Sequence, residues 1–207
     1  MSHNPIIAIL AGGQSKRMGR DKAMLPFGNQ TLLESIVGIA CATGIETIVA
    51  GREQPLHWAG RPVAFVDDAP GRQGPLGGLL TVQAQFNDRP ILLIGCDMPF
   101  MSTDALLWLI DAFETKHAAA NAIVGRVDDQ IEPLFAVYGP TTRVVVQRAF
   151  AAGTRSLRRI LLELEAVAVQ IPDAHLSAVI NINTEDQYSA LVTELNNLGG
   201  KKDTINQ

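Results

Sequence analysis

The segment from residue 6 to residue 22 reads IIAILAGGQSKRMGRDK, and its pattern decides the fold class. Five apolar residues run from Ile6 to Leu10, and Gly12 and Gly13 follow almost at once. A short, continuous apolar run that ends at glycines is typical of a strand buried on both faces, as in a parallel sheet. Ligands of such sheets bind beyond the carboxyl ends of the strands. We therefore expect the loop after residue 10 to bind a ligand.

The rest of the chain alternates short apolar runs with amphipathic stretches, which predicts an α/β fold. Expected strands are 5–11, 46–50, 62–67, 90–95, 121–126, 133–138 and 167–171, with a short one at 179–182. Expected helices are 31–43, 75–86, 102–117, 140–151, 155–164 and 184–196. The pattern indicates one three-layer, Rossmann-like domain over residues 1–198, a mostly parallel sheet with helices on both faces. Residues 199–207 are expected to form a flexible tail.

Composition excludes several classes of protein. The 207 residues include 17 Lys and Arg against 21 Asp and Glu, a net charge of −4, and 47% are hydrophobic. Disordered and collagen-like chains are excluded, and the acidic balance argues against a nucleic-acid binder. Two cysteines and four scattered histidines predict neither a disulfide framework nor a histidine zinc site. No apolar run approaches 18 residues, so a cytoplasmic chain without a membrane contact is expected.

The loop after the first strand carries a concentrated positive charge. Its basic residues are Lys16, Arg17, Arg20 and Lys22, with one acid, Asp21, among them. Backbone N–H groups near paired glycines form anion sites, to which basic side chains add full charges. The loop lacks the Gly-Lys-Ser/Thr of a Walker A motif and the GxGxxG of a dinucleotide fold. A solvated charged loop is the alternative, but the position after Gly12 and Gly13 favours a phosphate site.

Asp97 follows the apolar strand 90–95, at an edge of the sheet where ligands gather. A carboxylate there suits Mg²⁺, a hard cation that binds carboxylates together with substrate phosphates. The alternative is a cap for the next helix, but Ser102 or Thr103 can serve that purpose. Cys96 is interpreted as a packed residue rather than a nucleophile, because no histidine partner is evident.

Other polar residues leave two interpretations open. Asn181 and Asn183 alternate along the short expected strand, so both would face a polar ligand, or they cap the helix after Thr184. Asp68 ends an apolar strand and is either a solvated turn residue or a site residue. Two interpretations of Glu132 are equally supported: an acid in a loop, or a residue of the site.

Motifs along the chain resemble a known family when they are taken in order. LAGGQSKRMGRDK resembles the LAGG/LAAG-x-S-x-R-M-G-x-x-K signature of nucleotidyltransferases, and the whole set is similar to the MobA-type family of molybdenum cofactor guanylyltransferases. The resemblance spans roughly residues 6–192. Its further motifs are 74–79 (GPLGGL), 95–99 (GCDMP), 132–138 (EPLFAVY), 155–157 (RSL) and 181–184 (NINT).

The resemblance implies a nucleotide-diphospho-sugar transferase-like fold and a Mg²⁺-dependent reaction. GMP would pass from GTP to the terminal phosphate of molybdopterin, giving molybdopterin guanine dinucleotide and pyrophosphate. It implies catalytic residues Arg17, Lys22 and Asp97, with Asp97 as the metal ligand. It implies acceptor binding by Arg155, Asn181 and Asn183. The nucleotide would be bound by Leu10, Ala11, Gly12, Gly13, Lys22, Asp68, Gly74, Gly78 and Asp97. Lys16 and Arg20 would be solvated neighbours.

The sequence departs from the family at residues 50–52, where Ala-Gly-Arg stands in place of an expected asparagine. How guanine is selected is therefore open. A molybdopterin cytidylyltransferase is one alternative, although Gly12 and Gly13 in place of Ala-Gly favour GTP. A sugar- or alditol-phosphate nucleotidyltransferase is another, and a non-catalytic nucleotide-binding adaptor is a third. Transient contact with molybdenum-cofactor enzymes or insertion proteins is a further expectation.

Overall fold

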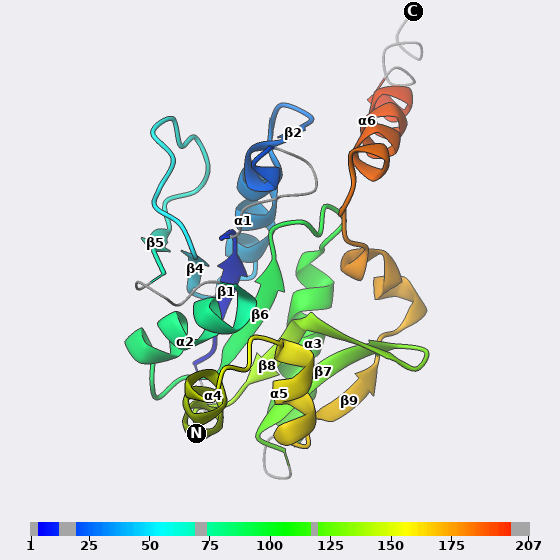
Figure 1. The fold of residues 1–207 in the computed structure, drawn as a ribbon. Coiled ribbons are helices and arrows are strands. Elements are labelled where there is room, and N and C mark those ends of the chain that lie inside the picture. Colours follow the sequence, from blue (N-terminus) through cyan, green and yellow to red (C-terminus); the bar gives the residue numbers. More distant parts are fainter. Residues whose placement is uncertain (1–3, 13–19, 69–73, 117–119, 200–207) are drawn as a thin grey trace, which may run out of the picture.

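A seven-stranded sheet runs through the computed structural model, which describes residues 4–12, 20–68, 74–116 and 120–199 (Figure 1). The strand order is β5-β4-β1-β6-β8-β7-β9. The strands are β1 (Ile6–Leu10), β4 (Thr47–Ala50), β5 (Ala64–Val66), β6 (Ile91–Gly95), β7 (Ala122–Val127), β8 (Gln130–Tyr138) and β9 (Val167–Gln170). Two-residue strands β2 (Pro26–Phe27) and β3 (Gln30–Thr31) form a separate hairpin.

The sheet is mostly parallel, as the apolar runs predict. β1 pairs in parallel with both β4 and β6, β4 with β5, and β7 with β9. β8 lies antiparallel between β6 and β7. The two-residue turn at Asp128 and Asp129 accounts for this, because so short a connection joins only antiparallel neighbours. Asp128 has a φ of 49°, which such tight turns require.

Helices cover both faces of the sheet, which confirms the expected three layers. Ile7 and Ile9 of β1 pack toward α1 (Leu32–Ala42) and α3 (Thr103–Lys116). Ile6 and Ala8 alternate with these residues along β1, so they face the other side of the sheet and pack toward the helices there. These helices are α2 (Pro75–Gln85), α4 (Thr142–Ala151) and α5 (Leu157–Glu163). Because both sets of β1 side chains are buried, the strand is apolar throughout rather than alternating.

The expected strand at 179–182 is wrong. A 3₁₀ helix, η2 (Asp173–Val179), occupies the start of this region, and the residues after it join no sheet. The Ile182 N–H instead donates a single hydrogen bond of 2.9 Å to the Asp97 carbonyl oxygen, just beyond the end of β6. A segment that crosses the edge of a sheet can form one such hydrogen bond without adding a strand to the sheet.

The last helix, α6 (Glu185–Gly199), projects away from the sheet (Figure 1). Its Tyr188 and Leu191 pack with Leu25, Leu32 and Ile182 in a small separate core. The Tyr188 hydroxyl donates to the Pro26 carbonyl oxygen at 2.8 Å. This contact joins the start of α6 to the β2–β3 hairpin. No helix in the described part of the chain is long and apolar enough to cross a membrane.

The capping box at the start of α1 gives a stability prediction. The Thr31 hydroxyl accepts from the Glu34 N–H at 3.2 Å, and the Glu34 carboxylate accepts from the Thr31 N–H at 2.7 Å. Thr31→Ala should lower the free energy of unfolding by about 1 kcal/mol, because a donor of the first turn loses its partner. Urea denaturation measures the change. Thr31→Ser keeps the hydroxyl and is the control; equal destabilisation of both variants would contradict the prediction.

Candidate functional site

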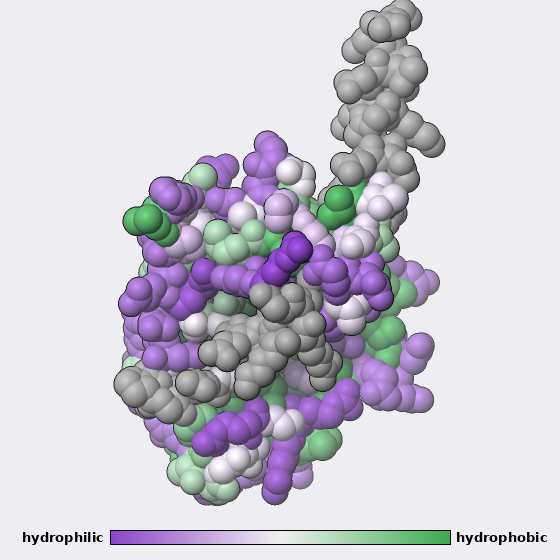
Figure 2. All heavy atoms as spheres, turned by 45° about the horizontal axis from the view of Figure 1, so that its top comes forward, coloured by the Kyte–Doolittle hydropathy of each residue, from purple (hydrophilic) through white to green (hydrophobic). Residues whose placement is uncertain are grey.

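A cleft of about 380 Å³ lies beyond the carboxyl ends of β1, β4 and β6. This is the edge where the sequence predicts a ligand, and the volume suits a small molecule. Figure 2, with this edge turned forward, shows a mostly hydrophilic face. The lining residues are Leu10, Ala11, Gly12, Asp21, Lys22, Ala23, Ala50, Gly51, Asp68, Gly74, Pro75, Gly78, Gly95, Cys96, Asp97, Leu134 and Asn183.

Two glycines bring the ends of β1 and β4 together at one wall of the cleft. A Cβ on Gly12 would lie only 2.5 Å from the Gly51 carbonyl oxygen, so the backbones have no room for a side chain. Gly51 has a φ of 89°, which few other residues adopt. Its N–H donates to Val66 of β5 at 2.9 Å. Both glycines therefore let the backbone itself line the site.

Helix α2 begins at the cleft. Gly74 precedes its first turn, and Gly78 in the second turn packs on the end of β1, where an added Cβ would lie 2.6 Å from a Leu10 methyl. The N-terminus of a helix carries unpaired N–H groups and a partial positive charge, which favour an anion. Asp68 also lines the cleft, and its carboxylate accepts from the Thr81 hydroxyl of α2 at 3.4 Å.

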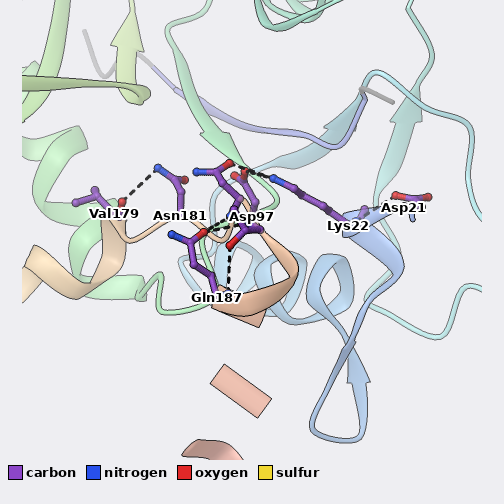
Figure 3. Close-up of polar contacts among 9 residues, drawn as sticks. Asp21, Lys22, Asp97, Val179, Asn181 and Gln187 are labelled. Carbon is purple, nitrogen blue, oxygen red and sulfur yellow. Dashed lines mark hydrogen bonds and ion pairs between the residues drawn. The ribbon is translucent and has the colours of Figure 1, made fainter. Parts of the chain in front are cut away.

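The charged centre of the cleft is formed by Lys22, Asp97 and Asn183. Lys22 lies in the single turn of 3₁₀ helix η1 (Lys22–Met24). Its Nζ lies 3.6 Å from an Asp97 carboxylate oxygen and donates to the Asn183 side-chain oxygen at 3.0 Å. Figure 3 shows the Lys22 side chain extended toward Asp97. Both charged side chains are about four-fifths buried, with 17% and 20% of their surface exposed.

Burial raises the pKa of the Asp97 carboxyl, and the positive charge of Lys22 opposes that shift. A carboxylate that is costly to ionise in the protein alone is stabilised when a cation binds it. Among the described residues no three His, Cys, Asp or Glu side chains gather as a metal site. The residues present nevertheless fit Mg²⁺, which commonly takes one or two carboxylates and completes its shell with substrate phosphates and water.

Cys96 is a packed thiol, as the sequence predicts. Burial, with a smaller contribution from the Asp97 charge, raises the pKa of its thiol to about 12. We expect iodoacetamide at pH 8 to leave Cys96 unmodified in the native protein and to label it fully in urea, since only the thiolate reacts. Peptide mass spectrometry measures both states. Rapid labelling of native Cys96 would contradict this interpretation.

Asn181 and Asn183 flank the residue that is bonded to Asp97. The Asn181 amide group donates to the Val179 carbonyl oxygen at 3.4 Å. Its side-chain oxygen is buried and has no hydrogen-bond partner in the described part of the chain. Asn181 is not among the residues that line the cleft. The Thr184 and Gln187 side chains form the expected capping interactions with the start of α6. Asn183 therefore remains available to contact Lys22.

The structure brings together most of the predicted site residues. Nine of them line the cleft: Leu10, Ala11, Gly12, Lys22, Asp68, Gly74, Gly78, Asp97 and Asn183. Gly13 and Arg17 lie outside the described residues. Arg155 does not line the cleft, because its guanidinium donates to the Phe150 and Thr154 carbonyl oxygens at 2.9 and 2.8 Å. It also lies 3.9 Å from the centre of the Phe150 ring. Glu132 lines a separate hollow, and burial raises the pKa of its carboxyl.

The roles of Asp21 and Arg52 were not predicted from the sequence. One Asp21 carboxylate oxygen accepts from the Ala23 N–H at 3.1 Å and so caps η1. The other accepts from the Arg52 guanidinium at 2.9 Å. An aspartate at the start of a short turn is a recognisable capping signal, but nothing in the sequence pairs it with a residue 31 positions away.

Comparisons with known proteins agree with this arrangement. A family model described as a MobA-like NTP transferase domain matches residues 7–167. A molybdenum cofactor guanylyltransferase of Xanthomonas euvesicatoria is 32% identical over 189 residues, 90% of this chain and 93% of that protein. One from Pseudomonas fluorescens is 31% identical over 181 residues, 86% of this chain and 88% of its own.

Solved structures share the fold. Molybdopterin-guanine dinucleotide biosynthesis protein A from Archaeoglobus fulgidus superposes with a TM-score of 0.75 at 23% identity, covering 90% of this chain and 96% of that one. The 2-C-methyl-D-erythritol 4-phosphate cytidylyltransferase of Thermus thermophilus has a TM-score of 0.61 at 15% identity, covering 90% and 97%. At these identities the likeness shows the fold alone, and that fold confirms the expected α/β architecture.

Proposed function

We propose a reaction for this chain, which belongs to the MobA-like NTP transferase family: transfer of GMP from GTP to the terminal phosphate of molybdopterin. The observation that carries the proposal is the cleft where Lys22, Asp97 and Asn183 meet beside the N-terminus of α2. The guanylyltransferases that this chain resembles, over about nine-tenths of its length, support the choice of substrates.

In the proposed step a terminal phosphate oxygen of the acceptor attacks the α-phosphorus of GTP. A new P–O bond forms, the bond between the α-phosphorus and the oxygen of the β-phosphate breaks, and pyrophosphate leaves with that electron pair. The attacking oxygen is already negative, so no strong general base is required. Repulsion between anions is the main obstacle, and catalysis therefore depends on positioning and on positive charge.

The residues of the cleft fit these requirements. The Gly12 backbone and the start of α2 would bind phosphates through N–H groups, and Lys22 would neutralise charge that develops in the transition state. Asp97 would hold Mg²⁺, which when bound supplies charge neutralisation between the phosphates. Asn183 would orient the acceptor, and the same role for Asn181, which does not line the cleft, stays a prediction. The roles of Arg17 toward pyrophosphate and of Arg155 toward the acceptor phosphate, and a cytoplasmic location, stay predictions.

Pyrophosphate release by the purified protein with molybdopterin and Mg²⁺ tests the proposal, with each of the four nucleoside triphosphates supplied in turn. We expect release with GTP and formation of the guanine dinucleotide. Preference for CTP would support the cytidylyltransferase alternative, which the departure at residues 50–52 leaves open. Binding of GTP without release of pyrophosphate would instead support a non-catalytic adaptor.

The pH dependence of transfer should report the state of Asp97. Burial raises the pKa of this carboxyl, so the group takes up a proton at a higher pH than a free aspartate does. Only the carboxylate binds Mg²⁺, and activity should therefore decline as pH falls through the raised pKa. Initial rates at fixed saturating GTP between pH 4 and 8 measure it. Flat activity down to pH 4 would contradict the metal assignment.

A further inference from the structure

We propose that Arg52 is a positioning residue that sets the place of Lys22 through Asp21; the inference rests on the proposed function. Arg52 follows β4, whereas Lys22 lies in η1, a separate single turn that lines the cleft. The link between them is Asp21, which binds both the Arg52 guanidinium at 2.9 Å and the η1 backbone at 3.1 Å.

The backbone at Arg52 is held firmly to the sheet. Gly51, directly before it, donates to the Val66 carbonyl oxygen at 2.9 Å and packs against Gly12 without room for a Cβ on either side. Only 19% of the Arg52 side chain is exposed. Because the backbone at Arg52 is fixed and its side chain is mostly buried, the guanidinium can hold the Asp21 carboxylate in a defined position.

The turn that carries Lys22 has less support of its own. η1 contains three residues, and its Ala23 N–H is capped by the Asp21 side chain rather than by another turn of helix. Leu25 anchors the far end, because it is 4% exposed and its carbonyl oxygen accepts from the Leu32 N–H at 3.0 Å. The contact from Arg52 to Asp21 therefore fixes the end of the turn from which Lys22 projects.

The position of Lys22 matters because its Nζ must reach two partners at once. It contacts Asn183 at 3.0 Å and Asp97 at 3.6 Å. A displacement of the order of 1 Å in a catalytic group can lower a rate by about 10²-fold. A second effect follows from charge. Asp21 lines the cleft, and the Arg52 charge offsets a carboxylate that would otherwise repel a triphosphate.

The Arg52 guanidinium also has unused donor capacity. Its Nε is buried and has no hydrogen-bond partner among the residues that the structure describes. Buried donors of this kind are rarely left unpaired without a functional reason. Arg52 does not itself line the cleft, so it acts on the site through Asp21, which does.

A double-mutant cycle tests the proposal. Arg52→Ala should lower kcat about tenfold and change the KM for GTP less than about threefold, with Arg52→Lys recovering most of the loss. In a Lys22→Ala background, Arg52→Ala should cause little further loss of kcat, because the positioning effect acts through Lys22. The smaller effect of the Asp21 charge on triphosphate binding persists in that background and appears in the KM for GTP. Losses that multiply would overturn the proposal. Arg20→Ala is the matched control, since it breaks a neighbouring exposed ion pair of 3.9 Å and should leave kcat unchanged.

Lysine labelling gives a readout that does not depend on the reaction. A low dose of acetic anhydride, followed by peptide mass spectrometry, compares Lys22 with the exposed Lys116 at the end of α3. Lys22 should be protected in the native protein, where 17% of its side chain is exposed, and should react several-fold faster in Arg52→Ala and in Asp21→Asn. Unchanged labelling in both variants would overturn the positioning role. Absent transfer by the unaltered protein would instead overturn the proposed function.

Discussion

Lys22→Met should lose about 10²- to 10³-fold in kcat for guanylyl transfer while the protein stays folded, by analogy with the loss of one transition-state donor. Methionine keeps the length and apolar stem of the side chain, so the variant removes chiefly the charge. That charge faces Asp97 at 3.6 Å and would otherwise face the phosphates of the substrates. Single-turnover rates with GTP and molybdopterin measure the effect.

The same variant should move the acid limb of the pH profile. Lys22 lowers the pKa of Asp97 against the larger effect of burial, so its removal leaves burial unopposed. The Asp97 pKa then rises further, and the loss of activity on acidification should begin at a higher pH. Arg20→Met, in an exposed neighbour, is the control. An unchanged acid limb in Lys22→Met would show that another group governs it.

Much of the fold could be predicted because the signals are local. The apolar run of β1 and the capping residues Thr31 and Thr184 identify their elements within a few positions of sequence. Since parallel strands all end at one edge of the sheet, the positions of Gly12 and Asp97 in the cleft also followed. Periodicity and topology together were therefore enough to locate the site.

The parts that escaped prediction depend on contacts between distant residues or on very short elements. β8 turns back on β7 through two residues, and η1 has three, too few to show a period. At 179–182, where a strand is expected, the backbone forms a single hydrogen bond to Asp97. The two residues meet only in the folded chain, so no local pattern indicates this bond. Lys22 meets Asn183 across 161 positions, and no local pattern encodes such a distance.

The chain is acidic as a whole, whereas its cleft provides positive charge, and this contrast has a physical explanation. A chain with net charge −4 repels anionic substrates over most of its surface, and salt screens that repulsion beyond about 10 Å. Attraction must therefore act at short range inside the cleft. Lys22 and the start of α2 provide it there, and Arg52 offsets the carboxylate of Asp21.

Asp97→Asn should abolish most Mg²⁺-dependent transfer, with a kcat loss of about 10²- to 10³-fold or more, and should not destabilise the fold. The amide keeps the shape of the side chain but is a poor ligand for a hard cation. The direction of the expected change in stability follows from the raised pKa of Asp97. Because the folded state holds its charged form less readily than the unfolded state, ionised Asp97 costs stability at neutral pH, and that cost disappears at acid pH.

The neutral asparagine should therefore match or exceed the stability of the unaltered protein at pH 7 and lose that advantage as pH falls through the raised pKa. Thermal unfolding at several pH values and Mg²⁺ titration of the transfer rate measure the two effects separately. Asp129→Asn, in the exposed β7–β8 turn, removes a carboxylate that does not line the cleft and should change neither. An Asp97→Asn protein that keeps its Mg²⁺-dependent rate would place the metal elsewhere, whereas one that unfolds at pH 7 would show that Asp97 serves the fold rather than the reaction.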